Sequence, residues 1–133
     1  MLMGSFTRNL SREEFACKCG CGYDTADFEL VNVLQSLVYF YEAQIHKPCA
    51  IHINSGSRCE SHNKSVGGSD DSQHLVGKAA DFYIFARDGS GRIPDDDIAD
   101  RLEFLFPNSH GIGRYNGRTH FDTRSERARW DKR

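Results

Sequence analysis

The chain has 133 residues, of which 38% are hydrophobic and 11% aromatic. This composition excludes an intrinsically disordered protein and predicts a single globular domain over residues 1–133. The formal net charge of -2 gives no general attraction to nucleic acid or to an anionic membrane surface, so we expect neither as a partner. No stretch approaches the roughly twenty apolar residues that a membrane span needs. Residues 1–6 lack a charged region followed by an apolar one, so we expect no secretory signal peptide.

The first predicted element is a short helix that begins near residue 11. Ser11 and Glu14 stand at the two positions of a capping box, in which each end of the motif satisfies a free backbone N–H group. Leu10 and Phe15 occupy the positions of a hydrophobic staple around the same helix start.

Five cysteines are many for a chain of this length, and three of them crowd into Cys17, Cys19 and Cys21. Cys49 and Cys59 follow further on, and the odd count leaves at least one thiol unpaired. Structural zinc sites usually combine two pairs of cysteines two to four residues apart, and this spacing does not match that pattern well. Three alternatives stay open: a second metal site, disulfides from the cluster to Cys49 or Cys59, and reduced thiols, the default in a cytosolic chain.

Two amphipathic helices are predicted in the remainder of the chain. The first covers residues 25–46, with Asp24 or Thr25 as its cap and Pro48 beyond its end. The second covers residues 94–106 and carries three aspartates, residues 95–97, in its first turn. A cation site is one interpretation of these aspartates, but negative charge at a helix N-terminus stabilises the helix and explains them better.

Four strands are predicted, at residues 50–54, 80–86, 110–115 and 119–123. The last two flank Asn116 and Gly117, a strong signal for a β-hairpin. His52 lies on the face of its strand opposite Ile51 and Ile53, and we do not expect it to bind metal. Together with the two helices, these strands predict an α+β fold in which a small antiparallel sheet packs against the helices.

The chemistry is concentrated in residues 72–81, SQHLVGKAAD. Small residues after His74 allow a tight turn, so this histidine lies in a loop while Asp81 enters a strand. Catalytic zinc sites typically use three protein ligands and leave a fourth position for water, and His120 is the best candidate for the third. Two imidazoles and one carboxylate suit Zn²⁺ better than Mg²⁺ or Ca²⁺, which prefer oxygen ligands.

These motifs resemble, in order along the chain, the zinc D-alanyl-D-alanine carboxypeptidase family. That family includes the phage L-alanyl-D-glutamate endopeptidases and shares its fold with hedgehog signalling domains. The matching segments are EFAC at 14–17, INSGSR at 53–58, HN at 62–63, VGG at 66–68, SQHLVGKAAD at 72–81, GIG at 111–113 and HFD at 120–122. The resemblance implies a hedgehog/DD-peptidase-like fold, zinc ligands His74, Asp81 and His120, and an Arg58 that binds or polarises the substrate.

The chain departs from that family at the general base. Many members carry Glu or Asp three residues before the last histidine, where this chain has Gly117. Asp122 shares a strand face with His120 and is the first substitute, and His110 across the predicted hairpin is the second. Alternatively, Asp122 only orients a histidine ligand and fixes its tautomer.

The sequence therefore predicts a zinc peptidase that hydrolyses amide bonds in peptidoglycan stem peptides, of carboxypeptidase or endopeptidase type. We expect a monomer that is made in the cytoplasm and acts on the cell wall, either as a phage endolysin released through a holin or as a wall-remodelling enzyme exported by another route. The alternative is a zinc-stabilised module without catalytic activity that binds a protein or the cell wall, and Gly117 is the feature that favours it.

Overall fold

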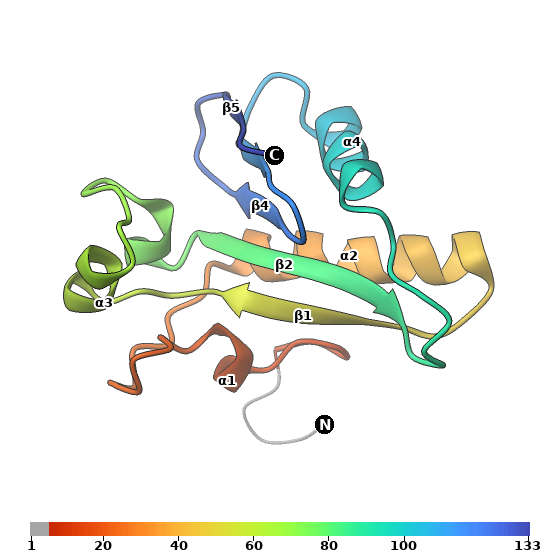
Figure 1. Ribbon diagram of the computed structural model, residues 1–133, viewed down its shortest axis with the longest axis horizontal. Helices are drawn as coiled ribbons and strands as arrows, with labels where there is room; N and C mark the ends of the chain where they lie inside the picture. Colours follow the sequence, from red (N-terminus) through yellow and green to blue (C-terminus); the bar gives the residue numbers. More distant parts are fainter. Residues whose placement is uncertain (1–5) are drawn as a thin grey trace.

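The computed structural model describes residues 6–133. The expectation that residues 1–6 form no signal peptide therefore falls, apart from Phe6, outside the described part. The elements follow one another as α1 (Arg12–Phe15), α2 (Phe28–Ile45), β1 (Cys49–Ser55), α3 (Glu60–Ser65), the 3-10 helix η1 (Gln73–Val76), β2 (Ala79–Ala86), α4 (Asp95–Leu105), β3 (Gly111–Arg114), β4 (Thr119–Asp122) and β5 (Ala128–Asp131). Figure 1 shows helices flanking a single twisted sheet. The predicted α+β class is confirmed.

The sheet has the strand order β1-β2-β4-β3-β5. Neighbouring strands are antiparallel from β1 through β2 and β4 to β3, as predicted. β5 pairs with β3 in parallel, so the expectation of a purely antiparallel sheet is wrong at this edge. Residues 128–131 gave no strand signal, because this four-residue segment mixes arginine and aspartate with a single tryptophan and has no apolar alternation.

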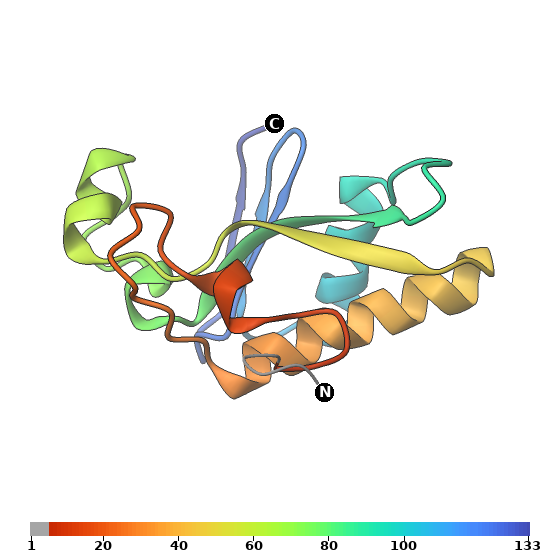
Figure 2. The same ribbon diagram turned by 90° about the horizontal axis from the view of Figure 1, so that it is seen from below.

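The hydrophobic core lies between the sheet and its helices. α2 packs against β1, and α4 packs against β3 and β4. Figure 2 shows α2 running along one side of the sheet, with α1 on the same side. β1 alternates between buried and exposed residues. Its buried side chains, including Ile51 and Ile53, face α2, whereas His52 is exposed on the other face.

Within residues 6–133, none of the helices has the length and apolar character that a membrane crossing requires.

Helix α2 begins two residues later than a cap at Thr25 would place it. Asp27 is the N-cap, and its carboxylate accepts a hydrogen bond from the Leu30 N–H. The segment before it is held in tertiary contacts: the Asp27 N–H donates to the Gly77 carbonyl at 2.8 Å, and the Ser57 hydroxyl donates to the Thr25 carbonyl. These contacts keep the segment extended, which sequence periodicity does not reveal.

Arg129 anchors β5 to the end of α4. Its guanidinium contacts both Glu103 carboxylate oxygens and donates to the carbonyls of Phe106, Ser109 and His110. Charge-assisted hydrogen bonds contribute about 1.5–3 kcal/mol each. We therefore expect Arg129→Ala to lower the free energy of unfolding by about 2–4 kcal/mol, because it leaves several carbonyls without a donor.

Urea unfolding followed by circular dichroism measures this effect. The matched control is Arg127→Ala, because Arg127 also pairs with Glu103 but its side chain is 50% exposed, against 18% for Arg129. An exposed ion pair contributes about 0–1 kcal/mol, so the control should change stability little. Equal effects of the two substitutions would contradict the anchoring role.

Candidate metal centre

Strand register brings residues from all five strands into one line across the sheet. Ser55 lies opposite Asp81, Asp81 opposite His120, His120 opposite Gly113, and Gly113 opposite Trp130. Residues that face each other across neighbouring strands project to the same side. We refer to these five residues as the cross-strand row, which lies on the face of the sheet away from α2.

His74 reaches the cross-strand row from η1. Its Nδ1 atom is 2.7 Å from the Gly56 carbonyl, so Nδ1 carries the proton and Nε2 is free. Nε2 lies 3.5 Å from Oδ2 of Asp81. Gly77 ends η1 with a φ of 71°, and a side chain there would collide with the Thr25 backbone. The glycine therefore permits the turn that carries the chain from His74 into β2.

His120 lies between two carboxylates. Its Nδ1 is 2.9 Å from Asp81 Oδ1, and its Nε2 is 2.7 Å from Asp122 Oδ2. Burial lowers the pKa of His120, but the hydrogen bonds to Asp122 and Asp81 raise that pKa by more. Burial likewise raises the pKa of Asp81, yet the hydrogen bond from His120 and the adjacent His74 imidazole hold that pKa well below its usual range. The site therefore keeps Asp81 ionised and able to bind a cation.

These three side chains fit a metal ion. One ligand atom from each of His74, Asp81 and His120 lies within 4.8 Å of the others, and all three residues are buried. The mixed set of two imidazoles and one carboxylate matches catalytic zinc sites, which leave one position open. Zinc held here would polarise a scissile carbonyl and lower the pKa of a water molecule. The structure thus brings together the three residues that the sequence predicted as metal ligands.

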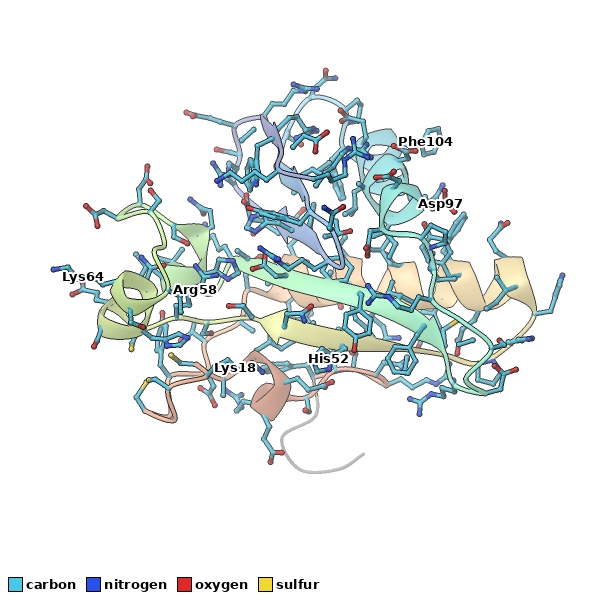
Figure 3. All side chains as sticks on the ribbon, viewed as in Figure 1. Lys18, His52, Arg58, Lys64, Asp97 and Phe104 are labelled. Atoms are coloured by element: carbon cyan, nitrogen blue, oxygen red, sulfur yellow. The ribbon has the colours of Figure 1, made fainter. Side chains whose placement is uncertain are left out.

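Arg58 lies beside this centre, in the loop between β1 and α3. Figure 3 shows it next to the start of β2. Its guanidinium donates to Ser55 Oγ at 3.1 Å and to Asn63 Oδ1 at 3.2 Å, and Nη2 lies 3.5 Å from Asp81 Oδ2. Asn63 is buried, and its amide also donates to the Ser69 carbonyl. A side chain on Gly68 would overlap the Asn63 amide that accepts the hydrogen bond from Arg58. The glycine in the Val66-Gly67-Gly68 turn therefore leaves room for the amide that holds Arg58.

Asp122 is enclosed by its partners. Its side chain is 0% exposed, and both oxygens accept hydrogen bonds from Arg124, at 2.7 and 2.8 Å, while Oδ2 also contacts His120. Burial raises the pKa of Asp122, but the hydrogen bonds from His120 and Arg124 hold it well below its usual range. Gly111 makes room for this carboxylate, since a Cβ atom there would lie 2.2 Å from Oδ2. This environment favours a role in orienting His120 over a role as general base.

The second candidate for the general base, His110, and the glycine at the position where the family resemblance implies a base, Gly117, both lie away from the centre. His110 Nε2 contacts Glu29 at 2.9 Å, Nδ1 contacts Ser109, and the ring stacks on Phe106. The structure thus does not bring His110 to His74, Asp81 and His120, because its ring stacks on Phe106 and Phe121 on the core side of the sheet. Gly117 forms the hairpin turn, where its N–H donates to the Asp95 carboxylate.

A cleft of about 580 Å³ opens over the metal ligands. Its lining includes four cationic residues, Arg58, Arg118, Arg124 and Lys132, and two carboxylates, Asp71 and Asp81. Trp130 and Tyr115 form an aromatic wall, joined by a hydrogen bond of 2.8 Å from the indole N–H to the Tyr115 oxygen. Sequence reasoning missed this wall and Arg124. Gly113 leaves room for the wall, because a Cβ atom there would lie 2.4 Å from the Trp130 ring, but this contact depends on the pairing of β3 with β5 and gives no signal in the sequence.

A buried His–Asp–His set below an open cationic cleft is the arrangement of a metal-dependent hydrolase. Comparison with protein families gives a match to Peptidase M15 over residues 8–122. The chain therefore belongs to the peptidase M15 family, whose members are zinc-dependent peptidases. The resemblance drawn from the sequence motifs is confirmed. No curated protein and no solved structure matches the chain.

The orienting role of Asp122 predicts a particular mutant phenotype. We expect Asp122→Asn to weaken zinc binding about 10- to 100-fold, as is typical when the hydrogen-bond partner of a metal ligand changes. The rate at saturating zinc should fall much less. Competition with a chromogenic chelator measures the zinc affinity, and a peptidase assay over a range of zinc concentrations measures the rate.

The control is Asp100→Asn, which disrupts the exposed pair between Arg114 and Asp100. It should leave zinc affinity and rate unchanged. A variant of Asp122 with normal zinc affinity but a greatly reduced rate would instead make Asp122 the general base.

Proposed function

We propose that this protein is a zinc-dependent peptidase that hydrolyses amide bonds in peptidoglycan stem peptides. The observation that carries the proposal is the position of the His74, Asp81 and His120 ligand set at the base of a cleft with Arg58 beside it. Membership of the peptidase M15 family supports the assignment of this protein as a peptide-bond hydrolase. The carboxypeptidase and endopeptidase types both suit this site.

The charge of the cleft supports an anionic peptide as substrate. Four cationic side chains line it against two carboxylates, although the chain as a whole has a net charge of -2. Stem peptides carry carboxylates at D-glutamate and at the C-terminus, and guanidinium groups bind carboxylates through paired hydrogen bonds. Arg58 would hold one carboxylate, and the aromatic wall of Tyr115 and Trp130 would contact the peptide backbone and side chains.

Asp71 is our candidate for the group that accepts a proton in the reaction, because its carboxylate lines the cleft. Among the cleft-lining residues in the described part of the chain, the carboxylates are Asp71 and Asp81, and Asp81 is a proposed metal ligand. Asp71 is exposed, and a hydrogen bond from Ser69 lowers its pKa, so the group is ionised at neutral pH. It differs from Asp122 in being open to the cleft, whereas both oxygens of Asp122 are occupied by Arg124.

We therefore expect Asp71→Asn to lower kcat about 100-fold or more while zinc content stays normal, because general acid–base groups contribute about 10²–10⁴ in rate. Asp70→Asn is the matched control, since Asp70 is the exposed neighbour and does not line the cleft. A normal rate in the Asp71 variant would show that another group accepts the proton.

Digestion of purified peptidoglycan tests the proposed function. The zinc-loaded protein should release fragments with new stem-peptide termini, and mass spectrometry of these termini identifies the bond that is cut. Protein treated with chelator should release none, and added zinc should restore the activity. Complete absence of new termini with zinc-loaded, folded protein would contradict the proposal.

A second candidate function is a zinc-stabilised binding module without catalytic activity. The specific observation in its favour is Gly117, a turn glycine at the position where the family resemblance led us to expect an acidic residue. Cosedimentation with peptidoglycan, without release of fragments, would support this function. The two candidates thus give opposite results in the same digestion experiment.

A further inference from the structure

A second cluster of possible metal ligands lies outside the cleft. Cys17, Cys19 and Cys21 come from the segment after α1, and Cys59 comes from the residue before α3. The four sulfur atoms lie within 4.8 Å of one another. Figure 3 shows sulfur atoms gathered where the N-terminal segment meets the start of α3. Sequence spacing argued against a metal site because structural zinc sites usually combine two closely spaced cysteine pairs, and Cys59 has no such neighbour.

The separations between sulfur atoms fit a shared metal ion better than disulfide bonds. The distances are 3.4 Å for Cys17–Cys19, 3.8 Å for Cys17–Cys59 and 3.7 Å for Cys19–Cys59. A tetrahedral Zn²⁺ with Zn–S bonds of about 2.3 Å places its sulfurs about 3.8 Å apart. A disulfide needs about 2.05 Å and pairs sulfurs two by two, whereas here three sulfurs are almost equidistant.

The backbone around the cysteines is shaped to direct these sulfurs inward. The Cys17 N–H donates to the Tyr23 carbonyl at 2.7 Å, which closes the segment into a loop. Gly20 and Gly22 have φ angles of 84° and 91°, which glycine adopts without strain. The sulfur of Cys59 accepts the His62 N–H at 3.4 Å. A hydrogen bond of this kind stabilises a thiolate, the form that binds metal.

We infer that Cys17, Cys19, Cys21 and Cys59 form a structural Zn²⁺ site, distinct from the His74, Asp81 and His120 centre. Four thiolates complete the tetrahedral coordination of zinc and leave no position for water, so this site stabilises structure and does not catalyse hydrolysis. Four thiolates at these distances repel one another strongly, and a divalent cation offsets that repulsion. Soft sulfur ligands also select zinc over Mg²⁺ or Ca²⁺.

The proposed zinc would brace the loop that carries Arg58. Cys59 is the next residue after Arg58, and the Arg58 N–H donates to the His74 carbonyl at 2.9 Å. The Ser57 N–H donates to the Phe15 carbonyl, and the Tyr23 hydroxyl donates to the Leu75 carbonyl. The N-terminal segment therefore touches both loops that enter the cleft. Joining it to Cys59 through a metal would limit the movement of Arg58 relative to the catalytic ligands.

Metal analysis of the full chain tests this inference. Protein purified with a thiol reductant and loaded with Zn²⁺ should contain two equivalents of zinc per chain. The double variant Cys19→Ser/Cys21→Ser should contain one, and since both residues are exposed, the substitutions do not disturb the core. Cys49→Ala is the control, because Cys49 is buried in β1 outside the cluster, and it should retain two equivalents.

Two further measurements distinguish the inference from its rivals and from the proposed function. Loading with Co²⁺ should give the sulfur-to-cobalt charge-transfer absorption of a tetrahedral thiolate site in the wild type and in His74→Ala, but not in the cysteine variant. In the wild type, chelation of the zinc should expose four additional reactive thiols.

A single equivalent of zinc in the wild type, without the sulfur-to-cobalt absorption, would overturn the inference. An intact mass that shows disulfides among these four cysteines would also overturn it. Failure of the peptidoglycan digestion would leave the cobalt spectrum unchanged, so the two proposals fail separately.

Discussion

Replacing His74 with alanine should remove the zinc from the catalytic centre and reduce peptidase activity by about a thousandfold or more. Metal catalysis contributes several kcal/mol to a hydrolytic transition state, and each 1.36 kcal/mol corresponds to about tenfold in rate. His74 is the cleanest of the three proposed ligands to remove, because within residues 6–133 the single hydrogen bond that its ring makes is the one from Nδ1 to the Gly56 carbonyl. His120→Ala would in addition leave the carboxylates of Asp81 and Asp122 without their shared partner.

Plasma mass spectrometry of the purified variant should show one zinc equivalent fewer than in the wild type. His52→Ala is the matched control. His52 is exposed on the face of the sheet that also carries Asp81 and His120, but its ring contacts Tyr83 and it does not belong to the proposed ligand set. Its zinc content and activity should equal those of the wild type. If His74→Ala and His120→Ala both keep the full zinc content, the catalytic metal does not lie in this centre.

The second large effect is expected at Arg58. Its guanidinium is held by Ser55 and Asn63 and is only 14% exposed, so its orientation toward the cleft is set before substrate binds. Lysine cannot reproduce the planar pair of donors that binds a carboxylate. Since hydrogen bonds to charged groups contribute about 1.5–3 kcal/mol, we expect Arg58→Lys to lower kcat/KM about 10- to 100-fold and Arg58→Ala to lower it further.

A comparison of two substrates identifies the interaction that is lost. Stem peptides with a free carboxylate should be cleaved faster than their amides by the wild type, and Arg58→Ala should remove this preference. Zinc content should stay near normal. Lys64→Ala is the control, because Lys64 is an exposed cation on α3 that Figure 3 shows on the outer side of the same region. If Arg58→Ala cleaves both substrates at the wild-type rate, Arg58 does not bind the substrate and the assignment to stem peptides loses its main support outside the metal ligands.

Local sequence patterns determined much of the fold. Ser11 and Glu14 form the predicted capping box, because both partners lie within one helical turn. Asn116 and Gly117 form the predicted hairpin turn, because Gly117 adopts a φ of 89° that most residues avoid. The alternation in β1 correctly placed Ile51 and Ile53 toward the core. In each case the decisive interactions are between neighbours in the chain or between a side chain and bulk solvent.

The sequence by itself also predicted that His74, Asp81 and His120 lie together, through the motif around the first two and the resemblance to a zinc peptidase family. Only the tertiary structure decided what surrounds them. Strand register aligned Trp130 of β5 with His120 of β4 across Gly113 of β3, and it placed Asp122 against Gly111, where Arg124 engages both carboxylate oxygens. Packing between distant segments also turned His110 toward Glu29 and brought Cys59 to the N-terminal cysteines. These arrangements depend on contacts between residues far apart in the chain, and hydrophobic periodicity specifies only which face of an element is buried, without naming the partner that covers it.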